Sequence, residues 1–388
     1  MFLTLTAKTA VRRGHPEWMS SRRTHVLRYR NLMRFPLLAL ISSILVCAAF
    51  GQNTTNTAAK TPKDPRELLA AARPAYDFDD ASLKPWHLKG KYQLFDENGK
   101  PGEEGKYEYW WTAPGVYRST WSRPGGMRTE WHTADGKTMS VASGRRILAM
   151  ERELRSFLVS AVPDVSKIPS NEADIEKDEL KLGNLTLPCA EVKTRKQKEG
   201  SQLPIPDIGA GEYCFDSPGI YLRVRRITTR EYVEFDHLMR AQEHVIAGEI
   251  TRSFERRTMF KFTLEGITHI DRADPAMTPT TDAALSADDV GQTTMAVTKR
   301  LLNTVPPIYP LRAKIDRVTG TVLMDVLIGR DGRVGDVVVV ASSSPLLSPA
   351  ARDAVAQWKY SPYVVDGQPL EVVARVRIIF SMPGRPGE

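Results

Sequence analysis

The sequence has little cysteine and little histidine, and both shortages limit its chemistry. Three cysteines and seven histidines occur among 388 residues. No Cys-x-x-Cys pair is present, which argues against a thioredoxin-like redox site or a zinc ribbon. His237 and His244 are seven positions apart, the wrong spacing for two metal ligands on one helical turn. We therefore expect neither a metal site nor a redox centre.

Motifs of common enzymes are missing as well. The chain contains no His-Glu-x-x-His, no Gly-x-Ser-x-Gly, no phosphate-binding loop and no Ser-x-x-Lys. Gly209-Ala210-Gly211 begins like a dinucleotide fingerprint, but Cys214 stands where the third glycine is needed. The sequence thus predicts a non-enzymatic protein with no cofactor, whose function is recognition.

An excess of one charge is confined to the first residues. The formal net charge is +8, but residues 1–51 hold eight basic residues and one acid. The rest of the chain has 46 basic and 45 acidic residues, which is close to neutral. A body without a basic surface lacks the electrostatic signature of nucleic-acid binding, so we expect no nucleic-acid partner.

Long apolar runs are absent except for one, from Phe35 to Phe50. It is about 16 residues long, short for the ~20 that a spanning helix needs. Arg34 precedes it and small residues follow it, which is the order of a secretory signal cleaved after Ala49 or Gly51. We expect residues 1–51 to direct export to the periplasm. The alternative is an uncleaved inner-membrane anchor. Because a signal starting at Met33 would have ordinary length, we interpret Met33 as the true translation start and residues 1–32 as an over-called start, which the protein does not contain.

Two cysteines remain in the exported body, Cys189 and Cys214. An even pair in an oxidising compartment predicts a disulfide. The two residues flank a 24-residue loop, and a hairpin between the flanking runs would bring them within bridging distance.

Most of the chain between the apolar run and residue 270 has the pattern of strands. We expect a tether over residues 52–74, with a short helix at Pro65–Ala72, and then an antiparallel β-rich domain over 75–270. Runs rich in aromatic and β-branched residues recur there between turn signals. One amphipathic helix is predicted from Ile147 to Val162 by its 3–4 spacing. The acidic run Glu172–Glu179 is interpreted as a solvated helix or loop.

Residues 271–294 are rich in Pro, Thr, Ala and Asp, which predicts a linker to a domain over 295–388. In that last domain a short helix, Leu311–Ile315, precedes the alternating strand Gly320–Ile328. Asp331-Gly332 predicts a hairpin turn, and a partner strand follows over 334–341. Ser348-Pro349 starts a helix with Ala351, Val355 and Trp358 on its buried face. A final strand is expected over 370–380.

This succession of motifs over residues 305–382 resembles the C-terminal domain of the TonB family. The matching residues, in order, are Tyr309, Pro310, Gly320, Asp331, Gly332, Trp358, Pro362 and Gly367. The resemblance implies a small αββαβ domain that binds an extended segment of an outer-membrane receptor as an added strand. Its partner-binding strand would contain Val372, Val373, Ala374, Arg375, Val376, Arg377 and Ile378. Alternation predicts that Arg375 and Arg377 point outward, to meet an acidic partner or to keep the edge soluble.

The chain departs from energy-transducing TonB proteins at its other end. The apolar segment 35–50 has no histidine, and no long Pro-rich spacer follows it. The sequence therefore resembles the receptor-contacting end of TonB without the end that docks on the proton channel.

The middle region resembles, more weakly, the LolA/LolB-like lipoprotein-sorting fold, in which an antiparallel half-barrel wraps a helix and holds acyl chains. With this resemblance the expected class is α+β: a signal or anchor segment, a half-barrel-like β domain with a packed helix, and the TonB-like domain. Trp86, Trp110, Trp111, Trp121 and Trp131 would then line a cavity or, alternatively, form ordinary core.

Two functional hypotheses follow from the resemblances. The first is a periplasmic TonB-family protein that docks on outer-membrane receptors or other envelope proteins and assists energy-coupled transport. The alternative is a carrier of lipid or lipoprotein in the middle domain, with the TonB-like module as a docking tag. A purely structural envelope protein is a third reading.

Overall fold

A computed structural model describes residues 3–8, 61–168, 170–171, 173–182, 184–195, 209–217, 220–286 and 300–382, with only the backbone of 3–8. The predicted signal segment at 35–50 lies outside these residues. Among the described residues, no helix has the length and apolarity needed to cross a membrane.

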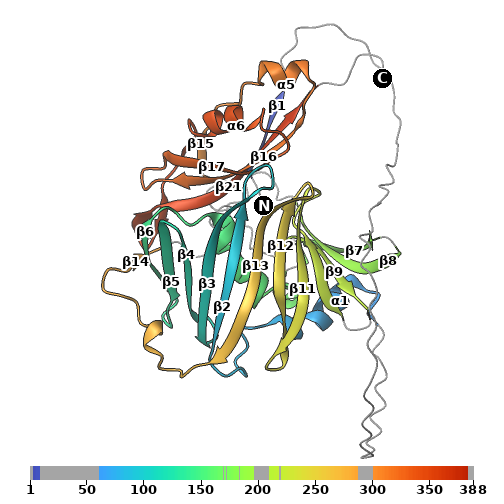
Figure 1. Cartoon of the computed structure of the whole chain (residues 1–388), viewed down its shortest axis with the longest axis vertical. Coiled ribbons are helices and arrows are strands. Elements are labelled where there is room, and N and C mark those ends of the chain that lie inside the picture. The colour runs from blue at the N-terminus through green and yellow to red at the C-terminus, as the bar shows by residue number, and fades with distance from the viewer. Residues whose placement is uncertain are drawn as a thin grey trace, which may run out of the picture.

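One large antiparallel sheet dominates the described part of the chain (Figure 1). Its strands run in the order β14-β6-β5-β4-β3-β2-β13-β12-β11-β10-β9-β8-β7. The strands from the first half are β2 (Trp86–Phe95), β3 (Pro101–Ala113), β4 (Val116–Arg123), β5 (Gly126–His132) and β6 (Thr138–Gly144). The others are β7 (Ala173–Leu182), β8 (Leu185–Thr194), β9 (Gly211–Asp216), β10 (Tyr221–Arg226), β11 (Glu231–Ala241), β12 (His244–Phe254), β13 (Arg257–His269) and β14 (Ala284–Leu285).

Short helices cover one face of this sheet. They are α1 (Pro65–Ala72), η1 (Arg73–Tyr76), α2 (Ala149–Arg152), α3 (Leu154–Val159) and η2 (Val165–Lys167). The strands alternate buried and exposed positions; in β3, Tyr107, Tyr109 and Trp111 face the helices and are buried. This alternation is the pattern of a sheet with one buried face, and it explains why the sequence reads as strands.

Two elements of this middle region differ from expectation. The helix predicted from Ile147 to Val162 is two short helices, α2 and α3, which meet at Glu153. Its apolar positions are nonetheless buried, since tertiary contacts and not helix length decide which side chains enter the core. The acidic run interpreted as a helix or loop lies mostly in edge strand β7, where charges on an exposed edge guard against aggregation.

Four of the five tryptophans proposed for a cavity wall are core residues. Trp86, Trp111, Trp121 and Trp131 are at most 2% exposed. Trp86 stacks on Trp111, and the indole N–H of Trp121 donates to the carbonyl oxygen of Glu151 at 2.9 Å. Trp86, Trp111 and Trp121 therefore fill the space between sheet and helices, which is the alternative that the sequence left open. Trp131 is buried on the other face of the sheet, where it contacts Ala276.

The predicted linker has structured parts. It contains η3 (Pro275–Met277) and strand β14, which pairs with β6. The indole N–H of Trp131 donates to the carbonyl oxygen of Ala276 at 3.0 Å. The described part of the segment, residues 271–286, thus packs against the large sheet.

The C-terminal module is a second, smaller unit above one end of the large sheet (Figure 1). It contains α5 (Leu311–Ile315), β16 (Gly320–Ile328), β17 (Val334–Ser342), α6 (Ser348–Val355) and β21 (Val372–Ser381). Two small pairs complete it: β15 (Leu301–Asn303) with β18 (Lys359–Tyr360), and β19 (Tyr363–Val365) with β20 (Gln368–Leu370). Its main sheet has the order β1-β21-β16-β17, where β1 is Leu3–Lys8. The helix predicted from Ser348 ends at Val355, and the last strand begins at Val372 because the Asp366-Gly367 turn forms its own hairpin.

Candidate functional site

The family-like motif residues hold the C-terminal module together. Tyr309 is 5% exposed, packs its ring edge-on against Phe380 at 5.3 Å, and donates its hydroxyl to the carbonyl oxygen of Val318. The indole N–H of Trp358 donates to the carbonyl oxygen of Val305 at 3.0 Å. The ring contact holds the chain before β16 against the end of β21, and the Trp358 bond ties the same chain to the segment after α6.

The backbone of the Asp331-Gly332 turn requires glycine at position 332. Gly332 has a φ of 79°, a left-handed conformation that favours glycine. A Cβ added there would collide with the carbonyl oxygen of Tyr360, whose amide donates to Gly332 at 2.8 Å. Asp331 accepts the amide of Arg333 at 3.0 Å, which completes the turn between β16 and β17.

Strand β21 is the predicted partner-binding strand, and its inner side chains form the module core. Val372, Ala374, Val376, Ile378 and Phe380 are at most 2% exposed and pack against α5 and α6. On one side β21 pairs antiparallel with β16. On its other side the backbone of β1 runs parallel to it, from Leu3 opposite Val376 to Lys8 opposite Ser381.

The other face of β21 does not point outward as expected. Arg375 is 1% exposed, so the prediction that it faces solvent or a partner is wrong. The middle region covers this face: Leu323, Val340 and Ala341 of the C-terminal sheet belong to the same apolar cluster as the core of the large sheet. The alternation correctly predicted which side chains of β21 face the module core. It could not show that the opposite face of the strand is also buried, because that burial comes from the middle region.

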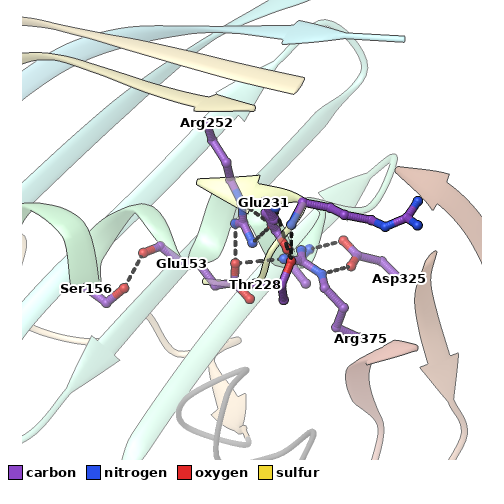
Figure 2. A network of polar contacts seen from close by, with 9 residues as sticks. Glu153, Ser156, Thr228, Glu231, Arg252, Asp325 and Arg375 are labelled. Carbon is purple, nitrogen blue, oxygen red and sulfur yellow. Dashed lines mark hydrogen bonds and ion pairs between the residues drawn. The ribbon is translucent and has the colours of Figure 1, made fainter. Parts of the chain in front are cut away.

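Arg375 lies at the centre of a buried ionic network that joins the two units (Figure 2). Its Nε donates to Asp325 Oδ1 and its Nη1 to Glu153 Oε2, both at 2.9 Å. Asp325 also accepts the backbone amide of Ala149 at 2.8 Å. The network therefore joins three elements through one side chain from each: Arg375 of β21, Asp325 of β16 and Glu153 of the α2–α3 segment.

Arg252 extends the network into the large sheet. Its guanidinium contacts Glu153 and donates through Nε to Glu231 Oε1 at 2.7 Å. Burial opposes ionisation of Glu153, but the charges of Arg252 and Arg375 outweigh it and lower the pKa of Glu153 to about 2. Burial disfavours the Arg375 cation, and Asp325 and Glu153 more than reverse this, so its pKa is raised.

Glu151 lies beside this network in a different setting. It is fully buried, and its carboxylate accepts the hydroxyl of Tyr92 and the amide of Leu148, each at 2.6 Å. Burial is the largest influence and raises the pKa of Glu151 above its ordinary value. The pKa values of the two acids thus shift in opposite directions, because Glu153 meets two arginines and Glu151, which meets only Arg123 at 3.2 Å, is governed by burial.

The network was not found from the sequence, although one signal was present. Asp325 interrupts the apolar strand Gly320–Ile328, and Arg375 interrupts the apolar final strand. The two residues are direct cross-strand partners in the observed register. A charge of each sign at matching positions of two apolar strands would have predicted their pairing; their link to Glu153 and Arg252 depends on tertiary structure.

The predicted disulfide between Cys189 and Cys214 is present. The two residues are direct partners in the β8–β9 ladder, with Cα atoms 4.1 Å apart. Glu212 approaches the two sulfurs to within 4.8 Å, a grouping that resembles a metal site by distance. Because both sulfurs are used in the disulfide, neither offers the thiolate that a metal ligand requires.

Three comparisons place parts of the chain beside known proteins. For the middle region, a LolA superfamily protein from Nitrosomonas europaea matches at 5% identity over 54% of this chain and 97% of its own, with a TM-score of 0.34. A second structure is a domain of a "putative outer membrane lipoprotein-sorting protein" from Vibrio parahaemolyticus. It matches at 8% identity over 53% of this chain and 93% of its own, with a TM-score of 0.33.

The C-terminal module has closer relatives. The protein TonB of Vibrio cholerae is 30% identical over 81 residues, which are 21% of this chain and about a third (33%) of that relative. The C-terminal domain of TonB from Pseudomonas aeruginosa is 30% identical and is covered to 88%, over 22% of this chain, with a TM-score of 0.20. The family described as "Gram-negative bacterial TonB protein C-terminal" matches residues 305–382. Those residues are therefore a C-terminal domain of the TonB family.

Proposed function

We propose that this chain is an exported envelope protein whose TonB-family domain docks on an outer-membrane receptor or another envelope protein, and so assists energy-coupled transport. Docking adds an extended segment of the partner to the outer edge of β21. In this mode main-chain hydrogen bonds supply affinity, and side-chain contacts supply modest specificity.

The pairing of β1 with β21 is the observation that most supports this proposal. The backbone of Leu3–Lys8 lies in parallel register along residues 376–381, so this edge has the geometry to accept a strand. Both faces of the β21–β16 pair are covered, one by α5 and α6 and the other by the middle region. The edge is then what the strand can offer to a partner.

Export would remove β1 from this edge. Residues 3–8 precede the apolar segment 35–50 and are absent from a chain that starts at Met33. In a chain that starts at Met1, cleavage after Ala49 or Gly51 would separate them from the body. The mature protein would then have an unpaired row of backbone donors and acceptors along β21, which is a template for strand addition.

A competition experiment tests this proposal. The chain beginning at Met33 is used to capture proteins from outer-membrane extract, with and without an excess of a peptide of residues 3–8. We expect the peptide to release the captured partner because it occupies the same edge. The matched control is the same peptide with proline in place of Leu5, which lacks one backbone donor and should compete poorly. Equal capture in all three samples would refute docking along β21.

The second candidate function is a carrier of acyl chains. The arrangement in its favour is a single large sheet with helices packed on its buried face. The packing of Trp86, Trp111 and Trp121 in that core disfavours it. Native mass spectrometry separates the two: a carrier isolated from the periplasm retains acyl ligands, whereas a docking protein has the mass of its polypeptide.

A further inference from the structure

Helix α5 and Ile308, which precedes it, expose three large aliphatic side chains in the described part of the chain. Ile308 is 85%, Leu311 74% and Ile315 65% exposed. Leu311 and Ile315 are four residues apart and lie on one side of α5, and Ile308 lies in the chain just before the helix. Tyr309 and Ala313 belong to the module core. Three exposed aliphatics within eight residues are more than scattered surface residues, and such patches mark contact sites.

Basic side chains surround this apolar face. Arg312, Lys314 and Arg317 are exposed on the same turn and the residues after it. Asp316 is the one acid among residues 308–318, and it pairs with Arg312 at 2.7 Å. The segment therefore has a net charge of +2 around an apolar centre. Apolar residues flanked by lysine and arginine are the composition of segments that lie in the interface of anionic membranes.

The size of the face argues against a second copy of the chain. A stable protein interface uses about 20–30 residues a side and ~800 Å² per partner. Three aliphatic side chains on a one-turn helix fall far below this. A bilayer surface has no such requirement, because a few inserted side chains and several charges act together.

The location also suits a membrane contact. Helix α5 lies at the end of the C-terminal module that is farthest from the large sheet (Figure 1). Tyr309, at the start of the face, contacts Phe380 near the end of β21. A membrane against α5 would thus hold the end of β21 close to the lipid surface.

We propose that the α5 face, formed by Ile308, Leu311 and Ile315 with Arg312, Lys314 and Arg317, binds the surface of an anionic lipid bilayer. The aliphatic side chains enter the boundary between headgroups and acyl chains, and the cations meet the lipid phosphates. This contact does not depend on strand addition at β21, so either proposal can fail without the other.

A site-specific label tests the contact, because the apolar segment 35–50 can itself enter a membrane and would obscure a simple binding assay. The full chain carries Cys47→Ser and Ile315→Cys, and an environment-sensitive fluorophore is attached at position 315. Cys189 and Cys214 are in their disulfide and are not labelled. With vesicles of phosphatidylglycerol and phosphatidylcholine, we expect a blue shift and quenching by nitroxide-bearing lipid. Phosphatidylcholine alone should give a smaller response.

Two matched variants make the test decisive. Arg312→Glu with Lys314→Glu should lower the ratio of lipid-contacting to free label by roughly 25-fold or more, since each basic residue contributes roughly fivefold. A label at Leu185→Cys, on another exposed leucine, should show no shift. The proposal is overturned by an absent shift at position 315 or by equal shifts at 315 and 185. A shift that follows protein concentration without vesicles would also overturn it, because it would indicate contact between copies.

Discussion

Arg375 makes two charged hydrogen bonds that join three elements of the fold. Its guanidinium reaches Asp325 on the neighbouring strand and Glu153 on the middle region at once. Replacing it with methionine, a side chain of similar length, leaves Asp325 without its cation and Glu153 with Arg252 alone, so we predict a loss of about 3–5 kcal/mol in the free energy of unfolding. Equilibrium urea unfolding measures it.

A double variant is the control for this prediction. Arg375→Met with Asp325→Leu removes both charges of the cross-strand pair and should cost less than the sum of Arg375→Met and Asp325→Leu made singly, because it leaves fewer buried ions unpaired. Additive costs would show that Arg375 and Asp325 are not energetically coupled.

Glu153 makes stability depend on pH. Its pKa falls from an ordinary 4.5 to about 2 in the folded protein, as the attraction of Arg252 and Arg375 exceeds the effect of burial. A depressed pKa means that the unfolded chain binds the proton first. The stabilisation is therefore complete above pH ~4.5 and is lost as the pH falls toward 2.

We predict that Glu153→Gln flattens the fall in unfolding free energy between pH 5 and pH 2, by at most roughly 3 kcal/mol. Glu151 acts in the opposite sense, because its pKa is raised: its contribution is present at low pH and is lost as the pH rises through its folded pKa. Comparing wild type with the single Glu153 variant cancels the Glu151 effect. An unchanged slope would mean that Glu153 is not held ionised by the two arginines.

At the scale of elements, the disulfide closes the loop between β8 and β9. The two cysteines are 25 positions apart in the sequence. Replacing both with alanine should lower the unfolding free energy by up to about 3.5 kcal/mol, because the unfolded chain regains the freedom of that loop. Urea unfolding of oxidised wild type and of the variant gives this difference, and two titratable thiols in native periplasmic protein would contradict the bond.

How far elements could be predicted depends on whether their signal is local. Pro65–Ala72, Leu311–Ile315 and Gly320–Ile328 have the predicted bounds, because proline starts, turn glycines and strict alternation mark them directly. The helix over 147–162 was predicted too long, since buried Glu151 and Glu153 bond to distant partners that a periodic pattern does not show. For the candidate site, the strand β21 was predictable, but the burial of Arg375 under another unit was not.

At the scale of the whole molecule, the two units share a core. Leu323, Val340 and Ala341 of the C-terminal sheet pack with the core of the large sheet, and Arg375 is buried at the same boundary. The C-terminal module alone would expose this apolar face and would leave its buried charges without their partners in the middle region. We predict that residues 295–388 expressed alone unfold at a lower urea concentration than the same module in the chain from residue 52.

Matched substitutions identify the cause of that difference. Leu323→Thr and Val340→Thr reduce the exposed apolar surface of the isolated module and should improve its solubility, whereas in the longer chain they should destabilise the shared core. The same urea midpoint for the module alone and within the chain would show that the two units are independent.

Photo-crosslinking in living cells is the most direct measurement of whether an envelope partner binds along the outer edge of β21. A photoreactive amino acid is placed at Ser381, opposite Lys8 of β1 at the end of that edge, and as a control at Leu185 on the β8 strand. The account predicts that crosslinks from position 381 capture outer-membrane proteins through their periplasm-facing segments and that position 185 does not. Crosslinks to the same proteins from both positions, or none from position 381, would contradict it.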